Sequence, residues 1–284
     1  MRLTSKSLIL DLLSTLPAGR AVSVRALVRA ASVLGIGENS VRVTLARLRA
    51  RGLVESAERG LYRMGAAAHA VNRQVRSWRR VEDEVCDWDG GWVGVQEEGA
   101  AGRSDAGRRA TALRLLGFQS LSGALHVRPD NLVGGVAALR ERLGALGIGA
   151  DVIVFALRDL DPERDARARD LWDVAALERG YDAGVAALEA SEARLPRLAP
   201  EAAMAESFRL GGQVVRQIVL DPLLPAPIVD TDERARLVET MRRYDVLGRE
   251  CWKSWAGETV ELEKTPSEGS GLAAALTRGE ASAP

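Results

Sequence analysis

With 284 residues, 46% of them hydrophobic, the chain can bury cores in two or three domains. It has no run of about 18 uncharged apolar residues, and the one short apolar run near its N-terminus contains acidic and hydroxyl residues, so we expect neither a membrane span nor export. Net charge is zero, yet residues 1–80 hold fifteen Lys or Arg against four Asp or Glu, which leaves 24 basic and 35 acidic residues in the rest. This asymmetry predicts an N-terminal module that meets a polyanion, joined to a body that does not.

Helices are predicted throughout the first fifty residues. Leucines recur at helical spacing over residues 4–16, and a proline and a glycine end that helix. The stretch SVRALVRAASVLG, residues 23–35, begins with a serine that can cap a helix and ends at a glycine. A third helix follows GIG at once, with Val41, Leu45 and Leu48 on its apolar stripe. Two helices joined by a short turn that contains glycine are typical of a helix-turn-helix.

The pattern changes after the third helix. LVES and LYRM are compatible with strands, and ERG at 58–60 is compatible with a tight turn, so a hairpin is predicted. Three helices followed by a hairpin make a winged helix-turn-helix, which we assign to residues 1–65.

Beyond this module the sequence predicts a linker, a mixed domain and a helical domain. Residues 66–91 have the pattern of a connecting helix or linker that ends at CDWDGGW. Over residues 92–158, strand, helix, strand, helix and strand alternate, as in a ferredoxin-like α/β sandwich. Helical periodicity dominates residues 159–256, and the tail at 257–284, rich in Gly, Ser, Ala and Glu, is expected to be disordered. The expected fold class is therefore α+β.

The outward face of the third helix carries side chains that can read DNA bases. With its apolar stripe turned inward, a rotation of about 100° per residue brings an amide, a hydroxyl, arginines and small apolar groups outward. In a major groove, Arg pairs with guanine, Asn pairs with adenine, and an apolar group contacts the thymine methyl. The predicted base-reading residues are Asn39, Ser40, Arg42, Val43 and Arg47.

Other side chains around this face suit phosphate contacts, which hold the register on DNA without selecting sequence. The predicted DNA-backbone residues are Arg25, Arg29, Thr44, Arg49, Arg51, Arg59 and Arg63. The alternative for any one of these arginines is a solvated charge with no partner. A helix-turn-helix used for protein contact is a further alternative, and it predicts no salt-sensitive binding to DNA.

Several stretches follow one another in an order that a known family shares. They are SLILDLL, LGIGENSVRVTLARLRARGLVES, LYRMG, WDGGW, LRLLGF, DLWDVAALERGY and DPLLPAPI. Together they resemble the PaaX family of bacterial transcriptional repressors over nearly the whole chain. The resemblance implies a winged helix, a Cas2-like ferredoxin domain and a helical C-terminal domain. It also implies a cytoplasmic homodimer that binds an inverted-repeat operator in double-stranded DNA, associated with the nucleoid when bound.

The same resemblance implies a small-molecule effector. The best-known members of the PaaX family are repressors of aromatic catabolism that an aryl-CoA thioester, phenylacetyl-CoA, releases from DNA. A planar aryl group could stack on a tryptophan, and the phosphates of CoA would need arginines nearby. The candidate effector-binding residues are Trp88, Trp92, Arg103, Arg108, Arg109 and Trp172. The alternative is that the tryptophans pack between domains and the arginines are solvated.

An enzyme is the alternative from a different class: a Cas2-like nuclease or an acyl-CoA-handling protein that the winged helix tethers to DNA. Cas2-like nucleases use an aspartate at the end of the first strand, where this chain has Glu97 and Glu98. His69 and His126 are far apart, and the two cysteines lack CxxC spacing, which argues against a metal site and a disulfide framework. We therefore expect no catalytic residue, no metal and no cofactor, but a DNA-binding protein.

Overall fold

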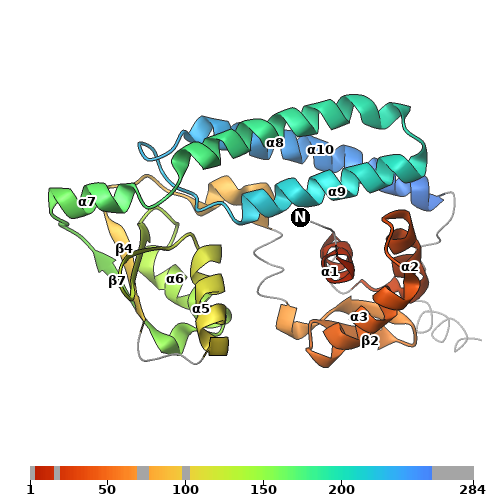
Figure 1. The fold of residues 1–284 in the computed structure, drawn as a ribbon, viewed down its shortest axis with the longest axis horizontal. Coiled ribbons are helices and arrows are strands. Elements are labelled where there is room, and N and C mark those ends of the chain that lie inside the picture. Colours follow the sequence, from red (N-terminus) through yellow and green to blue (C-terminus); the bar gives the residue numbers. More distant parts are fainter. Residues whose placement is uncertain (1–3, 16–19, 69–76, 98–102, 258–284) are drawn as a thin grey trace, which may run out of the picture. The chain divides into compact units, whose positions relative to one another are not determined.

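The computed structural model describes residues 4–15, 20–68, 77–97 and 103–257 (Figure 1). Helices and antiparallel sheets both occur, so the α+β class is confirmed. The chain divides into two compact units, which are described separately below. The first unit contains residues 1–68 together with 252–284, and the second contains residues 69–251.

The helices of the first unit follow the sequence prediction closely. They are α1 (Ser5–Thr15), α2 (Val24–Val33) and α3 (Glu38–Ala50). Ser23 caps α2, because its side chain accepts a hydrogen bond from the backbone N–H of Ala26 at 3.1 Å. Gly35, in the turn between α2 and α3, has a φ of +76°, a conformation that glycine adopts without strain. The apolar faces of these helices make the core of the unit: Leu8, Ile9, Leu12, Leu13, Leu27, Ala30, Ala31, Val41, Leu45 and Leu48 are all buried.

An antiparallel sheet completes the first unit. Its strands are β1 (Val22–Ser23), β2 (Val54–Glu58) and β3 (Leu61–Met64), in the order β1-β3-β2. The predicted hairpin of β2 and β3 is confirmed, and Gly60, which lies in the turn between the two strands, has a φ of +81°. The two-residue β1 was not predicted, because so short a strand has no period that a sequence can show.

The segment after the hairpin differs from the predicted connecting helix in the residues that the structure describes. Two 3₁₀ segments stand there, η1 (Ala66–Ala68) and η2 (Ser77–Glu84), the second interrupted by the non-helical backbone of Arg80. Trp78 and Val81, one before and one after this interruption, are both buried. Residues 69–76, which include His69, lie outside the described part.

The second unit contains an antiparallel sheet with helices on one side (Figure 1). Strands β4 (Trp92–Glu97), β5 (Gln119–Ser122), β6 (Leu125–Pro129) and β7 (Val152–Leu157) lie in the order β5-β6-β4-β7. Helix α5 (Arg103–Leu115) connects β4 to β5, while α6 (Gly135–Ala145) and η3 (Gly149–Asp151) connect β6 to β7. The predicted strands and helices here are confirmed, and β5 is an additional strand that sequence analysis missed.

Long helices complete the second unit, and α8, α9 and α10 run side by side in Figure 1. They are preceded by α7 (Pro162–Arg169), and their bounds are α8 (Val174–Arg194), η4 (Leu195–Arg197), α9 (Pro200–Val219) and α10 (Thr231–Gly257). Asp161 and Asp173 cap α7 and α8 by accepting hydrogen bonds from backbone N–H groups at 3.0 and 2.9 Å. Helix α10 continues past residue 251, so its last turns belong to the first unit.

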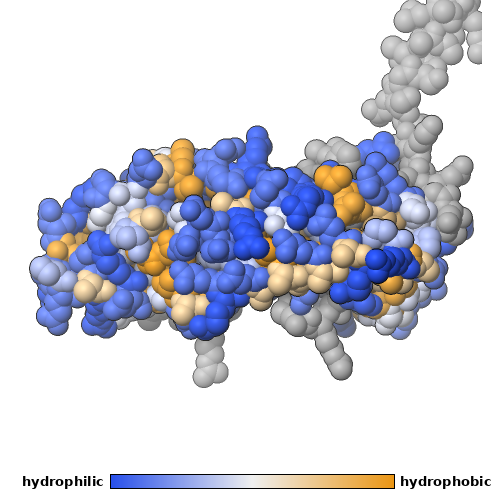
Figure 2. Space-filling view, turned by 90° about the horizontal axis from the view of Figure 1, so that it is seen from above, coloured by the Kyte–Doolittle hydropathy of each residue, from blue (hydrophilic) through white to orange (hydrophobic). Residues whose placement is uncertain are grey.

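The face seen in Figure 2 is mostly hydrophilic, with its hydrophobic residues in small groups. Within the described residues, every helix is too short or too polar to span a membrane. The tail predicted to be disordered begins at residue 257, which the structure gives as the last residue of α10, and residues 258–284 lie outside the described part.

Candidate functional site

Helix α3 presents the predicted base-reading face to solvent. Its buried residues are Val41, Leu45 and Leu48, the three that the helical periodicity predicted to face the core. The side chains of Asn39, Arg42, Val43 and Arg47 are exposed on the remaining surface. Val43 is 42% exposed, which leaves an apolar group free to contact a partner. The helix therefore offers an amide, guanidinium groups and a small apolar side chain together.

Ser40 has a structural partner that the sequence did not reveal. Its hydroxyl lies 2.5 Å from the hydroxyl of Ser5, so it is engaged at the contact between α3 and α1. Ser5 is largely buried, which holds the pair close to the core. Among the predicted base readers, Ser40 is thus engaged through its hydroxyl with a neighbouring helix, α1.

Arg42 is paired with a carboxylate one helical turn earlier. Its Nε donates to Oε1 of Glu38 at 2.7 Å, and both side chains are more than half exposed. Exposed ion pairs at this spacing contribute about 0.5 kcal/mol or less, so the guanidinium can leave Glu38 for a base at small cost. Arg47 has no comparable partner among the described residues.

The predicted DNA-backbone residues fall into different surroundings. Arg29 lies on α2 with its guanidinium 5.3 Å from the ring centre of Trp255, at the end of α10 in the same unit. Arg63 donates to Glu55 across the β2–β3 hairpin at 2.5 Å. Thr44 is half-buried. The remaining predicted backbone contacts are exposed: Arg25, Arg49, Arg51 and Arg59.

Residues 4–68 match the model of the family described as PaaX-like protein. The resemblance stated from sequence is thereby confirmed over the segment that contains α1 to β3. Among curated proteins, none matches the chain. In fold, the chain is similar to the solved structure "Uncharacterized protein Rv0674 from Mycobacterium tuberculosis", with a TM-score of 0.54 and 22% sequence identity. That alignment covers 88% of this chain and 99% of the other.

Outside the PaaX-like segment, three candidate effector residues form one aromatic cluster. The rings of Trp92 and Trp172 are nearly parallel with centres 6.3 Å apart, and Trp88 meets Trp92 edge-on at 5.4 Å. Trp92 and Trp172 are only 1% and 7% exposed. These two rings therefore pack β4 against the segment after α7, while Trp88 remains half-buried.

Polar groups fix the orientation of this cluster. The indole N–H of Trp92 donates to Oδ1 of Asp165 at 2.9 Å, and Arg169 donates to Oδ2 at 2.7 Å. Although burial opposes the effect, these hydrogen bonds lower the pKa of Asp165. The guanidinium of Arg169 also lies 4.6 Å from the ring centre of Trp88, whose own N–H donates to the carbonyl of Gly91.

The candidate effector arginines lie on α5, apart from the tryptophans in their contacts. Arg109 is buried, with Nη1 3.5 Å from Oε2 of Glu97, and Nε2 of His126 lies 2.8 Å from Oε1 of the same carboxylate. Arg108 is exposed, and the side chain of Arg103 is outside the described part. Glu97 lies at the end of β4, the position at which Cas2-like nucleases have an aspartate. The described residues contain no cluster of three or more His, Cys, Asp or Glu that could hold a metal ion.

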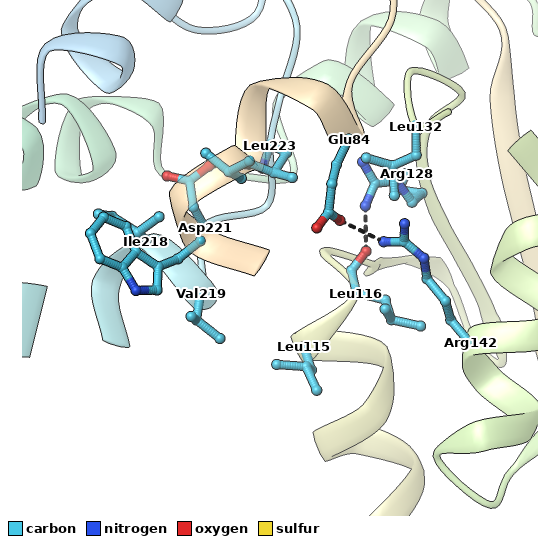
Figure 3. Close-up of a pocket in the computed structure, with 12 residues that line it drawn as sticks. Glu84, Leu115, Leu116, Arg128, Leu132, Arg142, Ile218, Val219, Asp221 and Leu223 are labelled. Carbon is cyan, nitrogen blue, oxygen red and sulfur yellow. Dashed lines mark hydrogen bonds and ion pairs between the residues drawn. The ribbon is translucent and has the colours of Figure 1, made fainter. Parts of the chain in front are cut away.

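A buried arginine holds the loop between α9 and α10. Arg128 is 1% exposed and donates to the carbonyls of Leu116, Pro129 and Pro222 and to Oδ1 of Asn131. Figure 3 shows Arg128 directed at Leu116, beside the ion pair of Arg142 with Glu84. Burial is the main reason that the pKa of Arg128 falls to about 9, so the guanidinium is still charged at neutral pH.

The two C-terminal motifs of the PaaX resemblance meet in this loop. The hydroxyl of Tyr181, from DLWDVAALERGY, donates to Oδ2 of Asp221, from DPLLPAPI, at 2.6 Å. Asp221 also accepts from the N–H of Leu223 at 2.8 Å, and Asn131 donates to the carbonyl of Leu223 at 2.7 Å. Burial, followed by the Asp221 carboxylate, raises the pKa of Tyr181, so its hydroxyl remains the donor. The spacing of these motifs in sequence thus reflects one buried network.

A cavity of about 380 Å³ lies next to this loop, wholly within the second unit. Of the candidate effector residues, Trp88 lines it, whereas Trp92, Trp172, Arg108 and Arg109 do not. The other residues that line the cavity could not be found from the sequence, because they come from segments far apart in the chain and share no motif. The wall consists of Val81, Glu82, Val85, Cys86, Asp87, Trp88, Asn131, Leu223, Pro225, Ala226, Thr231, Asp232, Arg234, Ala235 and Val238.

Proposed function

We propose that the chain is a DNA-binding transcriptional regulator that acts as a repressor. The observation that carries the proposal is the exposed face of α3, with Asn39, Arg42, Val43 and Arg47, inside the segment that matches the PaaX-like family. These groups are the ones that recognise base edges in a major groove. The proposed role is binding rather than catalysis.

The arrangement of elements supports this role. We assign α1 to β3 to a winged helix-turn-helix, because α2 and α3 are joined by a glycine turn and followed by a hairpin. We assign β4 to β7 to a ferredoxin-like, Cas2-like domain, since β-α-β-β-α-β connectivity with the order β5-β6-β4-β7 is the pattern of that fold. The helices α7 to α10 follow as a C-terminal domain.

The proposed form on DNA is a homodimer on an inverted repeat. Two copies of α3 would enter successive major grooves about 34 Å apart, one turn of the duplex. The PaaX resemblance suggests phenylacetic acid catabolism as the regulated pathway and an acyl-CoA thioester as effector. Such an effector releases DNA only if it binds better to a conformation with low DNA affinity.

The proposal predicts that Arg47→Ala weakens binding to the DNA upstream of the protein's own gene by about 1 to 3 kcal/mol, because a base contact is lost. Arg42→Ala should act in the same direction with a smaller loss, since Arg42 must first leave Glu38. An electrophoretic mobility shift titration measures both affinities.

The matched control is Arg179→Ala, which removes an exposed arginine from α8 in the second unit. It should leave the DNA affinity unchanged. If Arg47→Ala and Arg42→Ala both bind this DNA as tightly as the wild type does, α3 is not the base-reading helix.

A further inference from the structure

The cavity next to the α9–α10 loop has an apolar body and an acidic rim. Its apolar part is formed by side chains such as Val81, Val238 and Trp88, together with Leu223 and Pro225 from the loop. Its volume of about 380 Å³ falls in the range of small-molecule sites, which is about 300 to 1,000 Å³.

The walls of the cavity are held in place before any ligand arrives. Trp88 is fixed by its N–H bond to the carbonyl of Gly91 and by the guanidinium of Arg169 4.6 Å from its ring centre. Also in the wall, Asn131 donates to the carbonyl of Leu223 and so holds the loop. A preformed wall lowers the entropy cost of binding.

The charges along the rim decide which ligand fits. Glu82 is neutralised by its ion pair with Arg242, and Arg234 is engaged by the carbonyl of Leu224 at 2.7 Å and faces Asp221 at 3.9 Å. Asp87 and Asp232 are exposed, and their carboxylates have no cationic partner among the described residues. The cavity therefore presents uncompensated negative charge beside an aromatic ring. The carboxylates attract an organic cation and disfavour an anion, and the indole of Trp88, over which Arg169 already lies, adds apolar surface.

We propose that this cavity binds a small molecule with an apolar body and a positively charged amine. The polyphosphate of a CoA thioester is excluded by the same carboxylates, so such an effector would use another site. Rim charges of this kind distinguish an amine from an otherwise similar carboxylate by about tenfold or more in affinity.

Helix α10 gives the ligand a route to the DNA-binding unit, a step that rests on the proposed function. The helix begins at the cavity, where Asp232, Ala235 and Val238 are part of the wall. Its last turns belong to the first unit, where Trp255 is buried and contacts Arg29 of α2. A ligand at the start of α10 changes DNA affinity only if it binds one DNA-binding conformation better than another.

The test is isothermal titration of the full chain with 2-phenylethylamine, phenylacetamide, phenylacetate and phenylacetyl-CoA. The first three share a ring and differ in the charge of the head group. The amine should bind about tenfold tighter than phenylacetate, with the amide between them. Asp232→Asn should weaken the amine by about fivefold and leave the amide nearly unchanged.

Ala235→Trp fills the cavity from an exposed position on α10 and should abolish binding of the amine, whereas the matched Ala190→Trp on α8 should not. The inference is overturned if phenylacetate or phenylacetyl-CoA binds as tightly as the amine, if Ala235→Trp still binds, or if no compound binds. DNA affinity is measured separately. Amine binding without any DNA binding would therefore contradict the proposed function and leave the cavity assignment standing.

Discussion

At the scale of single residues, the buried pair of Tyr181 and Asp221 joins α8 to the loop before α10. Asp221 is 8% exposed, so its carboxylate depends on protein donors instead of water. Tyr181 supplies one of them at 2.6 Å. A hydrogen bond to a charged group contributes about 1.5 to 3 kcal/mol, roughly twice as much as a bond between neutral groups.

Tyr181→Phe should therefore lower the free energy of unfolding by about 1.5 to 3 kcal/mol, because a buried carboxylate loses a donor. Tyr244→Phe is the matched comparison, since Tyr244 is also buried but bonds the neutral hydroxyl of Ser191 at 2.8 Å. Its loss should be about 0.5 to 1.5 kcal/mol. Urea unfolding followed by circular dichroism measures both values, and equal losses would show that the charge of Asp221 does not matter.

The residues of α3 show what periodicity can and cannot predict. The inward positions of Val41, Leu45 and Leu48 follow from the helical repeat, and the structure confirms them. The engagement of Ser40 with Ser5 could not be predicted, because it joins residues 35 positions apart. The cavity was hidden for the same reason: its wall is assembled from segments between residues 81 and 238.

At the scale of elements, the turn from α5 into β5 is shaped by the loop it packs against. Gly117 has a φ of +74°, and a Cβ there would meet the carbonyl oxygen of Pro222 at 2.8 Å. Gly123, in the turn from β5 to β6, also has a positive φ of +52°, but a Cβ there would meet nothing within 4 Å. The two glycines share backbone strain and differ in crowding.

Gly117→Ala should lower the free energy of unfolding by about 2 to 4 kcal/mol, because the left-handed backbone and the contact with Pro222 both oppose a side chain. Gly123→Ala should cost about 1 kcal/mol, the backbone part alone. Urea unfolding of the two variants separates these effects. A loss at Gly117 no larger than that at Gly123 would mean that the loop yields without cost.

The predicted elements were those with a strong period or clear end signals. Ser23 and Gly35 bounded α2 in the sequence as they do in the structure. Strand β5 was missed, because Gln119–Ser122 is mostly polar, with exposed residues around the buried Leu121. Its place is set by pairing with β6, a tertiary interaction that overrides local propensity.

At the scale of the whole molecule, the separation of charge along the chain matters more than its sum. The basic excess of residues 1–80 is cancelled by the acidic excess of the rest, so a net charge of zero conceals the feature that bears on nucleic acid. Several of the basic residues are exposed arginines of the PaaX-like segment, among them Arg49, Arg51 and Arg59. Counterion release from DNA depends on these local charges and not on the net charge.

DNA affinity should consequently fall steeply with salt, with a slope of log K against log [salt] of about −0.9 for each phosphate contacted. Removing one such contact with Arg51→Ala should make the slope shallower by about 0.9, whereas Arg216→Ala, an exposed arginine of α9, should not change it. Fluorescence anisotropy of labelled operator DNA over a range of salt concentrations gives the slopes. A wild-type slope near zero would contradict the DNA-binding proposal and favour a protein partner for the first unit, because only phosphate contacts release counterions in proportion to their number.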